Sequence, residues 1–128
     1  MNEIISKYVG EKYSHNDKRG LDCLGLVVSF LHDNGIETPR DDGLYIKKDW
    51  YNENPNRLLD GLERHCIKVD ISELQALDIL AFEFDGVVRH LGVMVSRSRF
   101  LHARKGRLAA ITRLRHYKKY LHSIWRAR

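Results

Sequence analysis

The sequence predicts an α+β fold in which a buried helix packs against an antiparallel sheet. Apolar residues follow helical spacing in the first half of the 128 residues, whereas strand-like apolar runs begin after Asp78. Helices first and an antiparallel sheet second is an α+β layout. At this length we expect one domain over residues 1–128. No apolar run approaches the roughly 20 residues that cross a bilayer, so no membrane span is expected.

Three helices are expected before the strands. Residues 4–8 have helical apolar spacing and predict a short helix that ends near Gly10. From Asp22 to Asn34 the apolar residues cover most of a helical surface, which indicates a central, buried helix. After a long loop over residues 36–54, residues 56–65 form a third helix candidate.

Strand candidates fill the second half of the chain. The first, residues 79–84, is ended by the turn pair Asp85-Gly86. The next two, residues 90–95 and 99–103, are joined by residues 96–98. Two weaker candidates follow at residues 109–114 and 123–126.

Charge is unevenly distributed along the chain. Residues 1–86 carry 10 Lys and Arg against 17 Asp and Glu, whereas residues 87–128 carry 12 Lys and Arg and no acidic residue, for a net charge of +5. The basic end favours an anionic partner such as a wall polymer, a nucleic acid or an acidic protein surface. The alternative is that it pairs with the acidic first part. Because no nucleic-acid-binding motif is visible, nucleic acid is not an expected partner.

The N-terminal residues and the cysteines bear on localisation. Residues 1–7 lack the basic-then-apolar layout of a signal peptide. We therefore expect cytoplasmic synthesis, with virion association or export by another route if the protein acts elsewhere. Two cysteines at unrelated positions do not make a disulfide framework. Cys66 is interpreted as a small buried apolar side chain.

Cys23 is the strongest candidate for chemistry in this chain. The first turn of a helix presents unpaired N–H groups and a positive dipole end, which lower the pKa of a thiol and favour the thiolate. The same N–H groups can donate to a developing oxyanion. A neighbouring imidazole can stabilise the thiolate and give a proton to the leaving group. Alone, a cysteine at a helix start is more often a packed core residue.

His90 and His102 lie on consecutive predicted strands. If residues 96–98 form a three-residue loop, Gly92 lies opposite His102, and His90 lies diagonally from His102 on the same face, about 7–8 Å away between Cα atoms. A two-residue loop would put the two histidines on opposite faces. The glycine leaves space above the sheet for a ring. This geometry makes Cys23, His90 and His102 a candidate triad.

Four segments, in this order, resemble the NlpC-type family of papain-like cell-wall cysteine peptidases. They cover most of the chain from Gly10 onward and are Gly10-Glu11-Lys12-Tyr13, Asp22-Cys23-Leu24-Gly25-Leu26-Val27, His90-Leu91-Gly92 and Phe100-Leu101-His102-Ala103. The family patterns are Gly-x-x-Tyr, Asp-Cys-Ser-Gly-Leu-Val, His-x-Gly and Phe-x-His-Ala. The resemblance implies a papain-like α+β fold, in which a nucleophile-bearing N-terminal helix packs on a C-terminal antiparallel sheet.

The resemblance also implies an activity. Cys23 would be the nucleophile, His90 the general base and His102 the residue that orients His90. Tyr13 would bind substrate near the oxyanion, and Asp22 would hold an amine terminus. The implied reaction is hydrolysis of a peptidoglycan stem peptide between D-γ-glutamate and the diamino acid, with no cofactor and no metal.

Two positions depart from the family pattern. Leu24 stands where the family usually has Ser, whose hydroxyl helps to bind the free amine of the stem peptide, and Leu77 replaces a usual Gly. Since leucine cannot make that hydrogen bond, we expect tolerance of intact, glycan-linked stems. A bulky residue after the cysteine and a basic C-terminal end resemble phage-tail-associated members, so phage tail proteins are candidate partners.

Two other functions stay open. A zinc-binding module could use Cys23, His90 and His102 as ligands, although the short paired spacing of structural zinc sites is missing. A catalytically inactive interaction or structural protein, such as a phage tail component, is the other alternative.

Overall fold

The computed structural model describes residues 2–11, 23–38, 55–103 and 108–128 and has the expected α+β architecture. Its α-helices are α1 (Asn2–Tyr8), α2 (Cys23–Asp33) and α4 (Arg57–His65). Its strands are β1 (Cys66–Val69), β2 (Ile79–Phe84), β3 (Val87–Met94), β4 (Arg99–His102), β5 (Ala110–Arg113) and β6 (Leu121–Ala127). Three short 3-10 helices are η1 (Ile71–Glu73), η2 (Leu114–His116) and η3 (Lys118–Tyr120).

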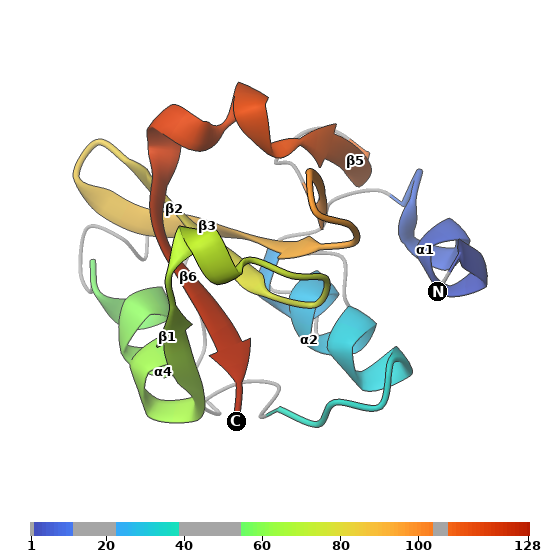
Figure 1. The fold of residues 1–128 in the computed structure, drawn as a ribbon, viewed down its shortest axis with the longest axis horizontal. Coiled ribbons are helices and arrows are strands. Elements are labelled where there is room, and N and C mark those ends of the chain that lie inside the picture. Colours follow the sequence, from blue (N-terminus) through green and yellow to red (C-terminus); the bar gives the residue numbers. More distant parts are fainter. Residues whose placement is uncertain (1, 12–22, 39–54, 104–107) are drawn as a thin grey trace.

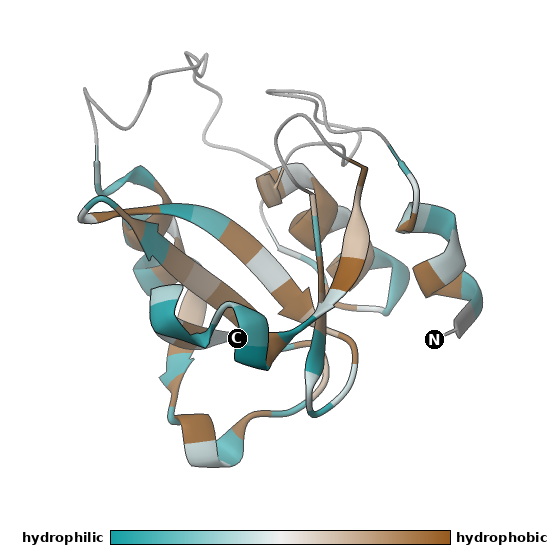
Figure 2. Cartoon of the chain, turned by 90° about the horizontal axis from the view of Figure 1, so that it is seen from above, coloured by the Kyte–Doolittle hydropathy of each residue, from teal (hydrophilic) through white to brown (hydrophobic). Residues whose placement is uncertain are grey.

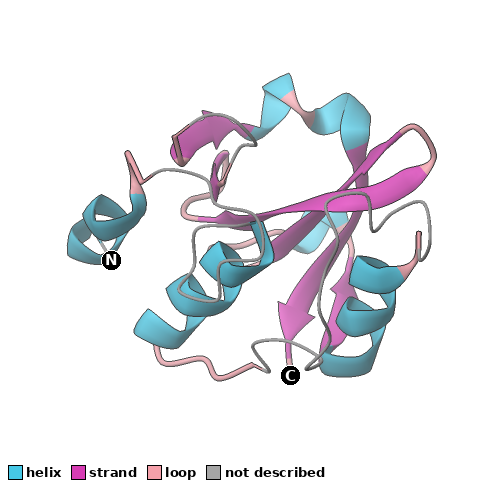
Figure 3. Cartoon of the chain, turned by 180° about the vertical axis from the view of Figure 1, so that it is seen from behind, coloured by secondary structure: helices cyan, strands magenta, loops and turns pink. Residues whose placement is uncertain are grey.

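The strands form one sheet in the order β1-β6-β2-β3-β4-β5, and every neighbouring pair is antiparallel (Figure 1). Helices α2 and α4 cover the same face of this sheet, and α1 packs on α2 (Figure 3). The apolar side chains of α2 that contact the sheet include Leu26, Phe30 and Leu31, which are at most 1% exposed. The prediction of a central, buried helix is therefore confirmed.

A second apolar cluster lies on the other face of the sheet. It contains Leu80, Phe82, Met94 and Phe100, and η2 and η3 with their flanking residues pack around it. These two 3-10 helices are mostly hydrophilic outside their core contacts (Figure 2). Because both faces of the central strands are covered, residues 79–82 of β2 and 91–94 of β3 are continuous buried runs rather than alternating ones.

The predicted register of the β3–β4 hairpin is confirmed. Val93 pairs with Leu101 and Met94 with Phe100, which leaves residues 96–98 as the loop and Gly92 level with His102. The ring beside Gly92 is Phe100, not a histidine: a Cβ at position 92 would lie 2.6 Å from Cδ2 of Phe100. A real Cβ cannot approach a ring carbon so closely, so this position requires glycine.

Strands β3 and β1 depart from the sequence-based expectation for identifiable reasons. Strand β3 begins at Val87 rather than His90, because Asp85 and Gly86 both have left-handed φ values, 53° and 80°, and close a two-residue turn between β2 and β3. Strand β1 was not predicted. Only its end residues are buried, so it lacks the alternation that marks a strand in sequence. Its first residue, Cys66, is 4% exposed and belongs to the core, as interpreted.

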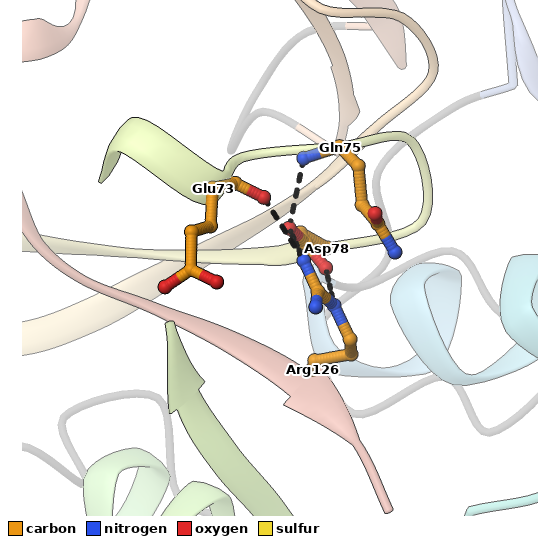
Figure 4. A network of polar contacts seen from close by, with 4 residues as sticks. All are labelled: Glu73, Gln75, Asp78 and Arg126. Carbon is orange, nitrogen blue, oxygen red and sulfur yellow. Dashed lines mark hydrogen bonds and ion pairs between the residues drawn. The ribbon is translucent and has the colours of Figure 1, made fainter. Parts of the chain in front are cut away.

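A buried ion pair ties β6 to the segment that precedes β2 (Figure 4). Asp78 is fully buried and accepts hydrogen bonds from Nε of Arg126 at 2.8 Å and from its Nη2 at 2.9 Å. The backbone N–H of Gln75 donates to the same carboxylate at 2.9 Å, and Nη2 of Arg126 also donates to the carbonyl of Glu73 at 3.1 Å. All polar demands of this buried carboxylate are thereby met within the fold.

Replacing Asp78 with Asn should lower the free energy of unfolding by about 2 kcal/mol, because the guanidinium of Arg126 loses its charge partner at a buried site. Urea denaturation followed by circular dichroism would measure this change. Asp85→Asn is the matched control: its carboxylate is 90% exposed in its pair with Arg89, so little change is expected. Equal effects of the two substitutions would contradict a stabilising role for the buried pair.

Candidate functional site

Cys23 is the first residue of α2, as predicted, and its side chain is partly buried against the main core. Helix α2 packs on β3 and β4, the two strands that carry His90 and His102, but the aromatic rings around the two histidines belong to the apolar cluster on the sheet face opposite α2. Neither cysteine is in a disulfide. Cys66 differs chemically from Cys23, because burial raises the pKa of its thiol and keeps it protonated. Of the two cysteines, Cys23 alone occupies a helix N-terminus, where the thiolate is favoured.

His90 and His102 are joined directly by a hydrogen bond. Nε2 of His90 lies 2.8 Å from Nδ1 of His102, and the two rings are nearly perpendicular at 70°. His102 is fully buried, whereas His90 is partly exposed. The diagonal pairing expected from the three-residue loop therefore brings the two rings into contact.

Aromatic rings enclose the histidine pair. Phe82 lies 5.7 Å from His90 between ring centroids, and Phe100 and Tyr117 lie 4.6 and 5.2 Å from His102. These apolar surroundings lower the pKa of His90 to about 4 by burial, which disfavours the protonated ring. At neutral pH His90 is thus uncharged and able to accept a proton.

Thr112 on β5 extends this hydrogen-bonded row and was not among the residues predicted for the site. Its Oγ1 lies 2.9 Å from Nε2 of His102, because Thr112 pairs with Phe100 across the β4–β5 ladder and so faces the same side as His102. A threonine in a strand is ordinary, and the β4–β5 register depends on a connection that sequence patterns do not specify. Only a correct prediction of how β4 pairs with β5 would have placed Thr112 beside His102.

The hydrogen-bonded row Thr112–His102–His90 restricts the tautomers that the two histidines can adopt. When His102 donates from Nε2 to Thr112, its Nδ1 can accept only from Nε2–H of His90. That arrangement leaves Nδ1 of His90 unprotonated and able to accept a proton. If His90 is protonated to an imidazolium, its Nε2–H still donates to His102 and its Nδ1–H becomes a second donor. The arrangement therefore suits a base that an orienting group holds in one tautomer.

The other predicted site residues and alternatives stand as follows. Tyr13 and Asp22 lie outside the described residues.

The facing nitrogens of His90 and His102 already share a hydrogen bond, so these atoms do not converge on a common ion as zinc ligands would. Among the described residues, no three His, Cys, Asp or Glu side chains form a group suited to a metal ion. Over the same residues, none of the helices has the length and hydrophobicity of a membrane span.

Comparison with known proteins gives a family-level match. The model of the NlpC/P60 family matches residues 10–126. No significant match to a curated protein is found. Similar solved structures include an NLP/P60 family protein similar to a lipoprotein from Staphylococcus aureus subsp. aureus Mu50, with a TM-score of 0.67 and 21% identity over 98% of this chain and 39% of that one.

Two more similar structures are NlpC2 from Trichomonas vaginalis and the NlpC/p60 domain of the peptidoglycan hydrolase SagA. NlpC2 has a TM-score of 0.71 and 21% identity, over 98% of this chain and 45% of that one. The SagA domain has a TM-score of 0.62 and 17% identity, over 96% of this chain and 92% of that one. At these identities the structures establish the fold. The chain spans about two fifths of the Staphylococcus aureus protein but nearly all of the SagA domain.

Thr112→Val should shift the tautomer of His102, because valine removes the hydroxyl that meets Nε2. Ring ¹⁵N chemical shifts, read by NMR near pH 7, would report the tautomers of both histidines. Thr112→Ser keeps the hydroxyl and should preserve the wild-type spectrum. Identical ring shifts in the valine variant would show that Thr112 does not set the tautomer.

Stability should fall as the pH is lowered from about 6.5 towards 4. The folded state holds His90 neutral down to a pKa of about 4, whereas the unfolded chain binds a proton near 6.5, so acid favours unfolding in this window. Between pH 7.5 and 5 the loss from this residue should be about 2 kcal/mol. Urea denaturation at the two pH values would measure it, and His90→Asn should remove that part of the difference. The exposed His65 provides the control: if His65→Asn flattens the dependence equally, His90 is not its source.

Proposed function

The chain belongs to the NlpC/P60 family, whose members are cysteine peptidases, and we propose that it hydrolyses an amide bond in peptidoglycan stem peptides. The observation that carries this proposal is the hydrogen-bonded pair of His90 and His102 on a hairpin packed against the helix that Cys23 begins. A thiol at a helix N-terminus and an oriented imidazole are the parts that acyl transfer needs. That SagA is a peptidoglycan hydrolase with the same fold supports the substrate class.

The proposed reaction passes through a thioester. The Cys23 thiolate adds to the carbonyl carbon of the scissile amide, and backbone N–H groups at the start of α2 donate to the oxyanion. His90 transfers a proton to the leaving amine as the carbon–nitrogen bond breaks. A water molecule, deprotonated by His90, then adds to the thioester carbon, and the acid product leaves as the proton returns to the sulfur. Each step uses the same imidazole, alternately as acid and base.

His102 would act through His90 in this mechanism. Since Nε2 of His90 is engaged with His102, the nitrogen left to face the thiol and the substrate is Nδ1. Apolar burial favours neutral His90, whereas a thiolate close to the ring would favour the imidazolium and would oppose this effect of burial. The hydrogen bond to His102 holds the ring in place during both transfers.

We place the scissile bond between D-γ-glutamate and the diamino acid, as the family resemblance implies. Asp22 would hold an amine terminus and Tyr13 would lie near the oxyanion. Leu24 packs against the main core and offers no hydroxyl to a free amine. A site without that hydrogen bond discriminates less between a free N-terminus and a glycan-linked stem. Glycan-linked stems are therefore proposed as substrates.

The proposal treats residues 1–128 as one catalytic domain. Support comes from the single sheet, from the packing of α1 on α2, and from the coverage of nearly the whole SagA domain. The basic residues after position 86 would draw the domain towards anionic wall material, an effect that salt weakens. Phage tail proteins remain proposed partners through the resemblance alone.

Incubation with purified sacculi, followed by mass analysis of released fragments, tests the proposal. We expect new fragments that end at D-γ-glutamate, none with Cys23→Ala, and roughly a hundredfold slower release with His102→Ala. Cys66→Ala is the matched control, because that thiol lies in the core away from the helix N-terminus, and it should retain activity if folded.

Two results would tell against the proposal. Fragment release that persists in Cys23→Ala would exclude this cysteine as the nucleophile. Hydrolysis restricted to freed peptides with an N-terminal amine would contradict the proposed substrate form, although not the chemistry.

A further inference from the structure

A groove of about 780 Å³ lies between η1 and its following loop, the tip of the β3–β4 hairpin and the segment from the end of β5 to η3. Four cationic side chains line it, and all four are exposed: Arg97, Arg113, Arg115 and Lys118. The hairpin tip is the end of β3 and β4 that is remote from His90 and His102. The groove is therefore separate from the proposed catalytic site.

Cationic side chains outnumber acidic ones in this groove. Among the described residues that line it, Glu73 is the only acidic one. Within the described parts of the chain, the four cations take part in none of the ion pairs, which instead involve Lys7, His32, Arg89 and Arg126. Concentrated like charge lowers stability through repulsion unless an anion neutralises it.

A second observation points the same way. Arg99 on β4 lies directly opposite Arg113 on β5, so two like charges form a cross-strand pair. Such a pair is destabilising, and sheets usually place opposite charges or apolar side chains at these positions. This repulsion acts on β5, whose last residue, Arg113, lines the groove. Arg113 also lines the groove, so an anion bound there would offset part of this repulsion.

The backbone around the groove is fixed in place. The N–H of Leu114 donates to the carbonyl of Ser98 at 2.8 Å, which holds the hairpin tip against the start of η2. On the other side, the ion pair between Asp78 and Arg126 anchors the loop that contains Glu73 and Gln75 (Figure 4). A preformed cationic groove loses little conformational entropy when it binds a ligand.

We propose that this groove binds a linear phosphodiester polymer built of polyol units. Arginine forks match phosphate oxygens and stay charged at any physiological pH, which suits a ligand with a repeating phosphate. The apolar side chains among the described lining residues, Ile71, Leu74 and Leu114, are aliphatic, so this part of the groove offers no aromatic ring on which a nucleic-acid base could stack. Binding there would hold the domain on a polymer while the distant histidine pair stays open. The inference goes beyond the proposed hydrolysis and does not depend on it.

The test is fluorescence anisotropy of a labelled poly(glycerol phosphate) chain at several NaCl concentrations. The wild-type protein should bind, and the logarithm of its association constant should fall linearly with the logarithm of salt concentration. The variant Arg115→Gln/Lys118→Gln should bind at least about tenfold more weakly and lower the salt slope by about 1.4, or about 0.7 for each lost contact. Binding should be unchanged in Cys23→Ala, which separates this inference from the hydrolysis.

The matched control removes the same two charges at the other edge of the sheet. Arg64→Gln/Lys68→Gln alters exposed cations on α4 and β1 and should keep the wild-type affinity and slope. Equal weakening by both double variants would overturn the proposal, because it would mean that net charge alone governs binding. Equal affinity for an oligothymidylate with as many phosphates, or for glycerol phosphate itself, would overturn the assignment to a base-free polymer.

Discussion

The register between β3 and β4 is the constraint on which the arrangement of this domain depends. A slip of one residue would turn His102 to the opposite face and separate it from His90. The ring of Phe100 occupies the space that a side chain at Gly92 would need, so the observed alignment requires glycine at this position. The hairpin loop and this glycine–ring contact therefore set the distance between the two imidazoles before any substrate is present.

The same hairpin separates two chemically different surfaces. At one end, aromatic rings surround His90 and His102, and water has little access to the buried imidazole. At the other end, the loop of residues 96–98 meets a cationic groove that faces solvent. A low-dielectric environment strengthens the electrostatic interactions of the histidine pair, whereas an exposed cationic surface attracts anions over a longer distance. The β3–β4 hairpin thus spans the distance between the two surfaces (Figure 1).

Much of this arrangement could be predicted from sequence, and the misses have physical causes. The apolar residues of α2, the turn at Asp85 and the loop of residues 96–98 each act locally, so their patterns were informative. Thr112 and β1 depend on pairings between distant segments, which local patterns do not encode. Leu77 is instructive, because its φ of 75° is a conformation that glycine adopts at the least cost. The family preference for glycine there follows from the backbone, while this chain keeps a leucine that packs on the core.

The position of β6 has a consequence for how the domain forms during synthesis. This strand follows all the others in the chain, yet it lies between β1 and β2 in the sheet. Until it emerges from the ribosome, β1 and the outer side of β2 are unpaired edges, open to other chains. The carboxylate of Asp78 also lacks its ion-pair partner until Arg126, 48 residues later in the chain, has been synthesised. The hairpins from β2 to β4 can form early, but the sheet is completed only when β6 inserts between β1 and β2 and brings Arg126 to Asp78, so those two strand edges stay exposed until then.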